Sequence, residues 1–235
     1  MKKYSLSMVA TAFNEEELIE SFIEKSIKDL SRVSDDFEVV LVNDGSTDRT
    51  LPIAKSLAGK YPQLKIVNLE KNAGTGANYI PGFKAASKEI VFNNTVDAFF
   101  DTQDLPGILP YLDEYDAVSG CRSDLKANNL YQKMLTLINY YLIKVLFRVN
   151  LRAFQTLQFH RRSFFDEIEI EARSSFLSPE LLLKALKSGR SLKEVEITFH
   201  PRKQGTPKGG KLSSVVRSLK DVLGFWCKWK ILNRW

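Results

Sequence analysis

Cysteine and histidine are scarce in this sequence. Two of each occur among its 235 residues: Cys121, Cys227, His160 and His200. The cysteines lie far apart and have neither the spacing of a zinc site nor that of a disulfide framework. The histidines lack companion ligands, which makes them poor candidates for a metal centre. We therefore expect a protein of the reducing cytoplasm rather than a disulfide-rich secreted one.

A long uninterrupted apolar run is also missing. The apolar stretch at residues 129–149 is broken by Lys133, Lys144 and Arg148, whereas a membrane-spanning helix needs about 20 predominantly apolar residues. An amphipathic helix, in the core or at a membrane interface, fits this stretch better. The first residues show no apolar segment with a small-residue cleavage site, so we expect no signal peptide.

Hydrophobic and charged residues are present in the proportions of a folded protein. They make up 44% and 26% of the chain, and the length suffices for one large domain with a real core. The net charge of +6 is unevenly spread, because residues 202–235 hold nine Lys or Arg and a single acid, Asp221. Such a tail attracts anionic surfaces, which include phospholipid, nucleic acid and an acidic partner.

The first half of the sequence alternates between strand and helix patterns. The alternation predicts an α/β fold with a mainly parallel sheet covered by helices. In such sheets, ligands bind at the carboxyl ends of the strands. The expected strands cover residues 4–13, 37–44, 64–70 and 88–94, and the expected helices cover residues 14–30, 45–61 and 76–87.

The most specific single signal is the segment VNDGSTDRT. Asp44 ends an expected buried strand, Gly45 allows a tight turn, and Ser46 or Asp48 can cap the helix that follows. A strand end of this kind forms a pocket of nucleotide size, in which Asp44 can accept hydrogen bonds from a base or a ribose.

The second half of the sequence is expected to be more helical. A helix is predicted to begin at Ser178, with Pro179 at its first position and Glu180 in its first turn. Residues 192–200 read as a strand, followed by a loop rich in Gly, Pro and Lys. We expect one domain over residues 1–210 and a basic amphipathic helix over residues 211–235.

This C-terminal helix has one apolar stripe, with basic residues largely off it. The combination predicts a helix that lies on a membrane surface, and the tryptophans favour lipid over nucleic acid, for which no role is expected. The stripe consists of Val215, Leu219, Val222, Trp226 and Trp229.

Several motifs in register resemble family 2 glycosyltransferases. The segments VATAFNEEE, VNDGSTDRT and NAGTGANYIPGFKAA carry the resemblance, which continues through YDAVSGCRSD, TLQFHRR and EVEITFHPRKQG over roughly residues 4–210. The sequence looks most similar to dolichyl- and polyprenyl-phosphate sugar transferases. The resemblance implies a GT-A fold and an inverting transfer from a UDP- or GDP-linked sugar to polyprenyl phosphate or a cell-envelope glycan. Together with the cysteine pattern and the basic amphipathic C-terminus, it leads us to expect a cytoplasmic protein, peripheral at the inner face of the membrane.

The resemblance also implies roles for individual residues. Ala12, Phe13 and Glu15 would line the base and ribose, and Asp44 would contact the base. Backbone at Gly74 and Gly76 would approach the donor. Polar side chains would face the sugar and the acceptor, and a basic loop would meet phosphates and supply charge on closure. The polar side chains that would face the sugar and the acceptor are Arg122, Gln158 and Glu180, and Asp97 would be a further catalytic residue. The basic loop that would meet phosphates contains His200, Arg202 and Lys203.

The metal motif departs from the family pattern. Asp97 matches the last acid of the family's Asp-x-Asp motif, but Thr95 replaces the first acid, and Phe99 replaces a polar residue that often follows. The expected cofactor is Mg²⁺ or Mn²⁺, held by Asp97 and by the donor diphosphate, because these ions take several ligands from substrate and water. Asp101 is expected to cap a turn or a helix.

Two alternatives from other classes remain open. The absence of the family's acid at Thr95 and of its polar residue at Phe99 is compatible with a non-catalytic, glycosyltransferase-like domain. Such a domain would bind a nucleotide sugar or a partner enzyme. A Rossmann-type dinucleotide enzyme is disfavoured, since no G-x-G-x-x-G follows the first strand.

Overall fold

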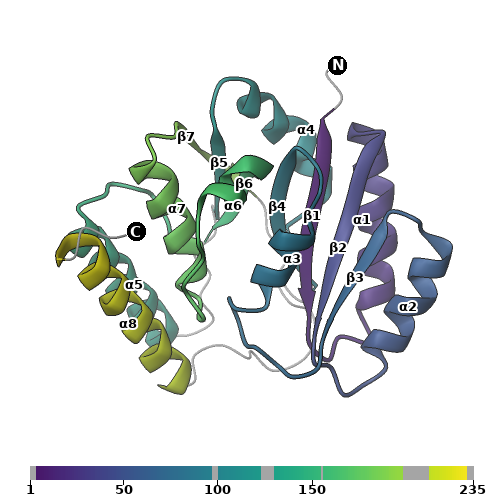
Figure 1. The fold of residues 1–235 in the computed structure, drawn as a ribbon, viewed down its shortest axis with the longest axis horizontal. Coiled ribbons are helices and arrows are strands. Elements are labelled where there is room, and N and C mark those ends of the chain that lie inside the picture. Colours follow the sequence, from purple (N-terminus) through teal and green to yellow (C-terminus); the bar gives the residue numbers. More distant parts are fainter. Residues whose placement is uncertain (1–3, 97–99, 123–129, 155, 198–211, 232–235) are drawn as a thin grey trace.

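The computed structural model describes residues 4–96, 100–122, 130–154, 156–197 and 212–231. Its centre is one seven-stranded sheet with the strand order β3-β2-β1-β4-β6-β5-β7 (Figure 1). The strands are β1 (Ser5–Ala12), β2 (Asp36–Asp44), β3 (Leu64–Leu69), β4 (Ile90–Thr95), β5 (Ala117–Arg122), β6 (Leu157–Arg161) and β7 (Leu192–Ile197).

The predicted mainly parallel sheet is confirmed. Strands β3, β2, β1 and β4 pair in parallel, and their register aligns Thr11 with Thr95 and Asp44 with Leu69. Strand β6 runs antiparallel to both β4 and β5, which the sequence patterns did not indicate. The carboxyl ends of the first four strands therefore lie at one edge of the sheet, at the bottom of Figure 1.

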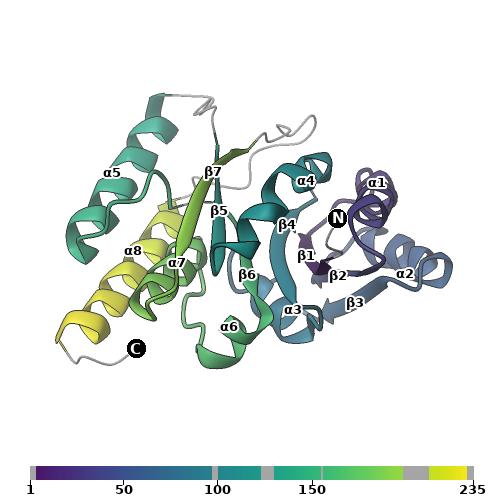
Figure 2. The same ribbon diagram turned by 90° about the horizontal axis from the view of Figure 1, so that it is seen from above.

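Helices cover both faces of the sheet (Figures 1 and 2). One face packs against α1 (Ile19–Val33), α2 (Thr50–Lys60) and α4 (Leu105–Ile108), with the 3₁₀ turns η1 (Thr102–Asp104) and η2 (Leu109–Asp113) nearby. The other face packs against α3 (Tyr79–Ala85), α6 (Arg162–Glu167) and α7 (Leu177–Lys187). Helices α5 (Leu130–Phe147) and α8 (Leu212–Trp226) extend this second layer, and the π-helical turn η3 (Cys227–Ile231) follows α8.

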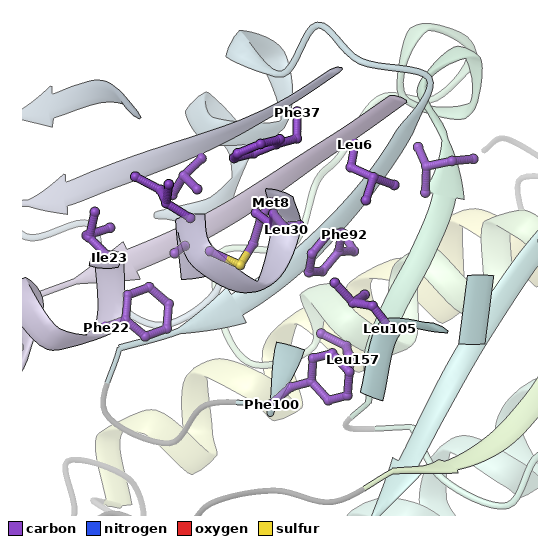
Figure 3. Close-up of a cluster of buried hydrophobic side chains, with 14 of the residues drawn as sticks. Leu6, Met8, Phe22, Ile23, Leu30, Phe37, Phe92, Phe100, Leu105 and Leu157 are labelled. Carbon is purple, nitrogen blue, oxygen red and sulfur yellow. The ribbon is translucent and has the colours of Figure 1, made fainter. Parts of the chain in front are cut away.

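The first core lies between the sheet and α1 (Figure 3). Leu6 and Met8 of β1 point to this face together with Phe92 of β4, because side chains two apart in a strand share a face. All three are fully buried, and each contributes about 1.5–3 kcal/mol through the removal of its apolar surface from water. Helix α1 supplies Phe22, Ile23 and Leu30 from the other side.

The second core includes the C-terminal helix. Val222 and Phe225 of α8 are buried against α5 and α7, and Trp226 donates a hydrogen bond of 3.1 Å from Nε1 to the carbonyl of Leu146. Trp229 packs its ring 5.4 Å from the Phe147 ring. Val222 and both tryptophans thus pack on the protein's own core instead of facing a membrane, whereas Leu219 of the same stripe is 43% exposed. Contact of the C-terminal helix with a membrane stays a prediction.

Some predicted helix boundaries also differ from the structure. Helix α1 begins at Ile19 rather than at residue 14, because the residues after β1 form a turn instead. Helix α7 begins at Leu177, so Ser178 is not its N-cap. The Ser178 hydroxyl instead accepts the N–H of Thr156 at 3.1 Å and donates to the Thr156 carbonyl at 3.1 Å.

The close packing of α3 on the sheet generates a prediction about stability. A Cβ built on Gly82 would lie 2.4 Å from Val9 Cγ1 and 2.8 Å from Val42 Cγ2, so Gly82→Ala should lower the free energy of unfolding by about 1–3 kcal/mol. Gly59→Ala is the matched control in α2, where a Cβ meets no heavy atom within 4 Å and should stabilise by about 0.4–1 kcal/mol. Urea denaturation measures both, and equal effects would contradict the packing described here.

Candidate functional site

The turns that follow β1 and β2 are joined to each other. Asn14 has a positive φ of 53°, a conformation that Asn tolerates better than most residues. Its backbone N–H donates to the Ser46 hydroxyl at 3.0 Å, and its Oδ1 accepts the N–H of Thr47 at 2.8 Å. The two strand ends are thus held at a fixed separation.

Asp48 and Glu16 add further hydrogen bonds between these two turns, next to the start of helix α2. Asp48 accepts the N–H of Thr50 at 2.9 Å and the N–H of Glu16 at 3.2 Å, while the Glu16 carboxylate accepts the N–H of Arg49 at 3.0 Å. The N-cap of α2 is Arg49, so neither Ser46 nor Asp48 occupies the cap position, although Asp48 satisfies the N–H of the first helical residue. Glu15 is buried, and its N–H donates to the Thr50 hydroxyl at 2.8 Å.

Asp44 lies at the end of β2 with only 1% of its surface exposed. Its Oδ1 accepts the N–H of Ala73 at 2.6 Å, and its Oδ2 accepts the side-chain amide of Asn78 at 3.2 Å. Burial raises the pKa of the Asp44 carboxyl above its ordinary value, and hydrogen bonds from Ala73, Asn78 and the Gly74 backbone oppose that rise. The carboxylate thus fixes the glycine turn, residues 72–78, against the end of β2.

Glycines in this region allow backbone to approach backbone. A Cβ built on Gly45 would lie 2.6 Å from the Asn72 nitrogen, and one built on Gly76 would lie 1.9 Å from the Ser174 carbonyl oxygen. Gly74 and Gly76 have positive φ values of 85° and 107°, in the region that favours glycine. Any larger residue at position 76 would push the glycine turn away from the segment that precedes α7.

The end of β4 is closed into a loop by Asn94. The Asn94 Oδ1 accepts the N–H of Phe100 at 3.0 Å, its Nδ2 donates to the Phe100 carbonyl at 3.3 Å, and its own carbonyl accepts the Tyr79 hydroxyl at 2.6 Å. Asp101 accepts the N–H of Gln103 at 3.1 Å, which confirms its predicted capping role. It also forms an ion pair with Lys25 at 2.8 Å.

Gln158 and His160 are buried beneath this edge. The Gln158 amide donates to the Ser178 hydroxyl at 2.7 Å and to the Ser178 carbonyl at 2.8 Å, and its Oε1 lies 2.9 Å from His160 Nε2. The His160 ring stacks on Phe164 with a centroid distance of 4.4 Å, as expected for a packing residue. Gln158 is 2% exposed, so its predicted contact with the sugar or acceptor has no direct opening in this conformation.

Glu180 is fully buried within α7. Its carboxylate accepts the N–H groups of Glu171 at 2.9 Å and Ala172 at 2.7 Å, and it pairs with Lys184 at 2.9 Å. These contacts hold the segment before α7 and give Glu180 a structural task. Its predicted role toward the acceptor stays a prediction.

The predicted site residues fall into three groups. The structure brings together Ala12, Phe13, Glu15, Asp44, Gly74 and Gly76 at the carboxyl edge of β1–β3. Gln158 and Glu180 lie deeper, and the Gln158 amide donates to Ser178, which belongs to the same helix α7 as Glu180. Asp97, His200, Arg202, Lys203 and the side chain of Arg122 lie outside the described residues.

Sequence reasoning missed the amides that shape this edge. Asn78 and Asn94 each use both ends of the side-chain amide to hold a turn. The sequence signal that could have identified Asn78 and Asn94 was their position, in the glycine-rich segment and at the end of an expected strand.

A groove of about 670 Å³ between η1, α4, η2 and β7 is lined by none of the predicted site residues. Among the described residues, no group of three His, Cys, Asp or Glu side chains is placed to hold a metal ion.

The model of glycosyl transferase family 2 matches residues 7–169. A dodecaprenyl-phosphate galacturonate synthase of Rhizobium johnstonii is 27% identical over 95% of this chain and 67% of its own length. An undecaprenyl-phosphate 4-deoxy-4-formamido-L-arabinose transferase of Proteus mirabilis is 24% identical over 93% and 66%. The chain thus spans about two thirds of the length of these relatives.

Solved structures show the same fold. Glucosyl-3-phosphoglycerate synthase of Mycobacterium tuberculosis, in complex with Mn²⁺, UDP and phosphoglyceric acid, matches 95% of this chain and 78% of its own with a TM-score of 0.72 and 19% identity. A mannosyltransferase of Pyrobaculum calidifontis, in complex with GDP-Man and Mn²⁺, matches 95% and 65% with a TM-score of 0.61 and 17% identity. The predicted GT-A fold is confirmed by these likenesses.

The burial of His160 generates a prediction about acid stability. Burial lowers the pKa of His160 from 6.5 to about 3, so below pH 6.5 the unfolded chain binds a proton that the folded chain does not. Stability is therefore lost as pH falls from about 6.5 toward about 3. His160→Gln should flatten the stability profile in this window by up to about 1.4 kcal/mol per pH unit. Denaturation at several pH values measures the slope, and parallel profiles for the two proteins would contradict the assignment.

Proposed function

Because the chain belongs to glycosyl transferase family 2, we propose that it transfers a sugar from a UDP- or GDP-linked donor to a polyprenyl-phosphate or cell-envelope glycan acceptor, with inversion. The observation that carries the proposal is the Asp44 carboxylate, buried at the end of β2 and bonded to the glycine turn. A strand end of this kind, where a buried carboxylate holds a turn whose glycines carry no side chain, suits the approach of a nucleotide. The relatives named for polyprenyl-phosphate transfer support the acceptor.

The chemistry requires stabilisation of the leaving group. An oxygen of the acceptor attacks the anomeric carbon while the bond to the donor diphosphate breaks, and negative charge grows on the nucleotide. Asp97 and the diphosphate oxygens would hold Mg²⁺ or Mn²⁺, which supplies positive charge there. Solved structures of the same fold contain Mn²⁺ with UDP, which supports this cofactor. The basic loop with His200, Arg202 and Lys203 would add further charge.

The acceptor determines whether a base is needed. A lipid phosphate is already ionised and attacks without a strong general base, whereas a hydroxyl acceptor must lose a proton. Glu180 is a poor base for that purpose, because its carboxylate is bound by two backbone amides and Lys184 inside α7. Asp97 is then the remaining candidate for the base.

We also place this function at a membrane surface. None of the helices in the described parts of the chain is both long and apolar enough to cross a bilayer. Helices α5 and α8 nevertheless expose apolar side chains on the outside of the second core, where they lie side by side (Figures 1 and 2). These side chains, here called the apolar surface, are 43–71% exposed and comprise Met134, Leu137, Ile138, Tyr141, Val145, Val216, Leu219 and Leu223. An apolar surface on a basic helix suits the interface of an anionic bilayer, which supports a peripheral position at the inner membrane face.

A binding module without turnover is the second candidate. Thr95 is the last residue of β4 and pairs with Thr11 of β1. The residue two positions before Asp97 therefore carries a hydroxyl instead of a carboxylate. A domain of this kind would bind a nucleotide sugar without transferring it.

Replacement of Asp97 separates the two candidates. Asp97→Asn should lower the rate of sugar transfer to polyprenyl phosphate on the order of 100-fold, since a metal's charge contributes several kcal/mol to the transition state. Thr95→Asp should lower the Mn²⁺ concentration needed for half-maximal activity, because it adds a second hard ligand. Radiolabelled transfer assays with a UDP- or GDP-sugar measure both quantities.

Asp104→Asn is the matched control, because Asp104 is an exposed acid beyond the same loop and should leave transfer unchanged. Wild-type protein that binds a nucleotide sugar but shows no transfer, with or without Mn²⁺, would favour the binding module. Equal transfer by wild type and Asp97→Asn would contradict the assigned role of Asp97.

The apolar surface generates a second prediction. Leu219→Ser combined with Leu223→Ser should reduce cosedimentation with phosphatidylglycerol vesicles at least about tenfold, because each buried leucine contributes about 1.5–3 kcal/mol. Tyr111→Ser on η2 is the control, since Tyr111 is 36% exposed and lies away from α5 and α8. Unchanged vesicle binding by the double variant would refute contact through this surface.

A further inference from the structure

Helix α8 places an arginine beside the glycine turn. A Cβ built on Gly74 would lie 3.1 Å from Nη1 of Arg217, so the guanidinium group lies against the backbone of this turn. The N-terminal end of α8 lies toward the same edge as the carboxyl ends of β1–β4 (Figure 1). Arg217 therefore joins the candidate site from a helix that the sequence assigned only to the membrane.

The charge of Arg217 is not neutralised by any neighbour among the described residues. Its side chain is exposed, and within the described parts of the chain it makes neither an ion pair nor a hydrogen bond. Asp221 stands one helical turn further, where an acid commonly pairs with a base four residues away. The Asp221 Oδ2 instead accepts the Ser174 hydroxyl at 2.6 Å and the N–H of Arg173 at 3.0 Å.

The same contacts fix the position of Arg217. Ser174 touches Asp221 through its hydroxyl and the glycine turn through its carbonyl, which lies against Gly76. Ser218 is buried, with its hydroxyl 3.5 Å from that of Ser175. Helix α8 is thus held against the segment that also supports the glycine turn, which keeps the Arg217 guanidinium beside this turn.

A guanidinium group in this position suits a phosphate. Its planar array of N–H donors matches phosphate oxygens with two parallel hydrogen bonds, and it stays charged at all relevant pH values. Gly74 has no side chain to keep a ligand away from the turn. We propose that Arg217 binds a phosphate group in the site, either in the donor diphosphate or in the lipid phosphate of the acceptor. This inference rests on the proposed function.

The alternative is an arginine that only packs its aliphatic stem on the glycine turn. Replacing such an arginine would affect stability but would not distinguish ligands by their phosphates. Replacing a phosphate-binding arginine weakens the binding of ligands that carry a phosphate and leaves the binding of a nucleoside unchanged.

Calorimetric titration separates these two roles. With Mn²⁺ present and no lipid, UDP, GDP and uridine are titrated into wild type, Arg217→Ala, Arg217→Lys and Lys220→Ala. If Arg217 binds the donor, Arg217→Ala should weaken binding of the nucleoside diphosphate about tenfold or more, while uridine binding stays unchanged. Arg217→Lys should recover part of the loss. Lys220→Ala is the control because Lys220 is an exposed cation on the same helix.

A second arm identifies the source of the phosphate. The affinity for farnesyl phosphate is measured for the same proteins with the nucleotide at saturation. A tenfold loss confined to farnesyl phosphate assigns Arg217 to the acceptor, and a loss confined to UDP or GDP assigns it to the donor. Equal affinities of wild type and Arg217→Ala in both arms overturn this inference alone. Wild type that binds neither nucleotide nor farnesyl phosphate overturns the proposed function and this inference with it.

Discussion

The buried carboxylate of Asp44 connects the parallel sheet to the glycine turn, and the candidate site depends on this connection. Its oxygens accept backbone N–H groups of residues 73 and 74 and the amide of Asn78. Burial makes this carboxylate costly to ionise, and hydrogen bonds from the turn compensate part of that cost. The turn therefore takes its position from β2, and the tight fit of Gly76 against Ser174 passes that position on to the segment before α7.

Helix α8 completes this series of contacts. Its inner face buries Val222 and Phe225 in the second core, its Asp221 holds Ser174, and its exposed flank carries Leu219 and Leu223. One helix thus touches the protein core, the candidate donor site and, in our proposal, the membrane. In our proposal, this arrangement would bring a lipid-bound phosphate to the edge of the sheet that carries the candidate nucleotide site.

The sequence allowed much of the fold to be predicted, and the residues explain why. The β-branched run that ends at Asp44 is buried along nearly its whole length, as a central parallel strand requires. The position of Asp44 at the carboxyl edge followed from the same pattern. The roles of Gln158 and Glu180 did not, because a polar residue in a motif does not show whether its partner is a ligand or a buried backbone amide. In α8, periodicity indicated an apolar stripe but not whether lipid or protein covers it, and the approach of Arg217 to Gly74 joins segments far apart in the chain.

The central claim is that the Asp44 carboxylate and the glycine turn form a nucleotide-sugar site. Calorimetric titration of UDP- and GDP-linked sugars in the presence of Mn²⁺, into wild type and Asp44→Asn, tests it most directly. The account predicts that wild type binds a nucleotide sugar and that Asp44→Asn binds it at least about tenfold more weakly, because the turn loses a charged acceptor. Wild type that binds no nucleotide sugar, or an Asp44→Asn variant that binds as tightly as wild type, would contradict it.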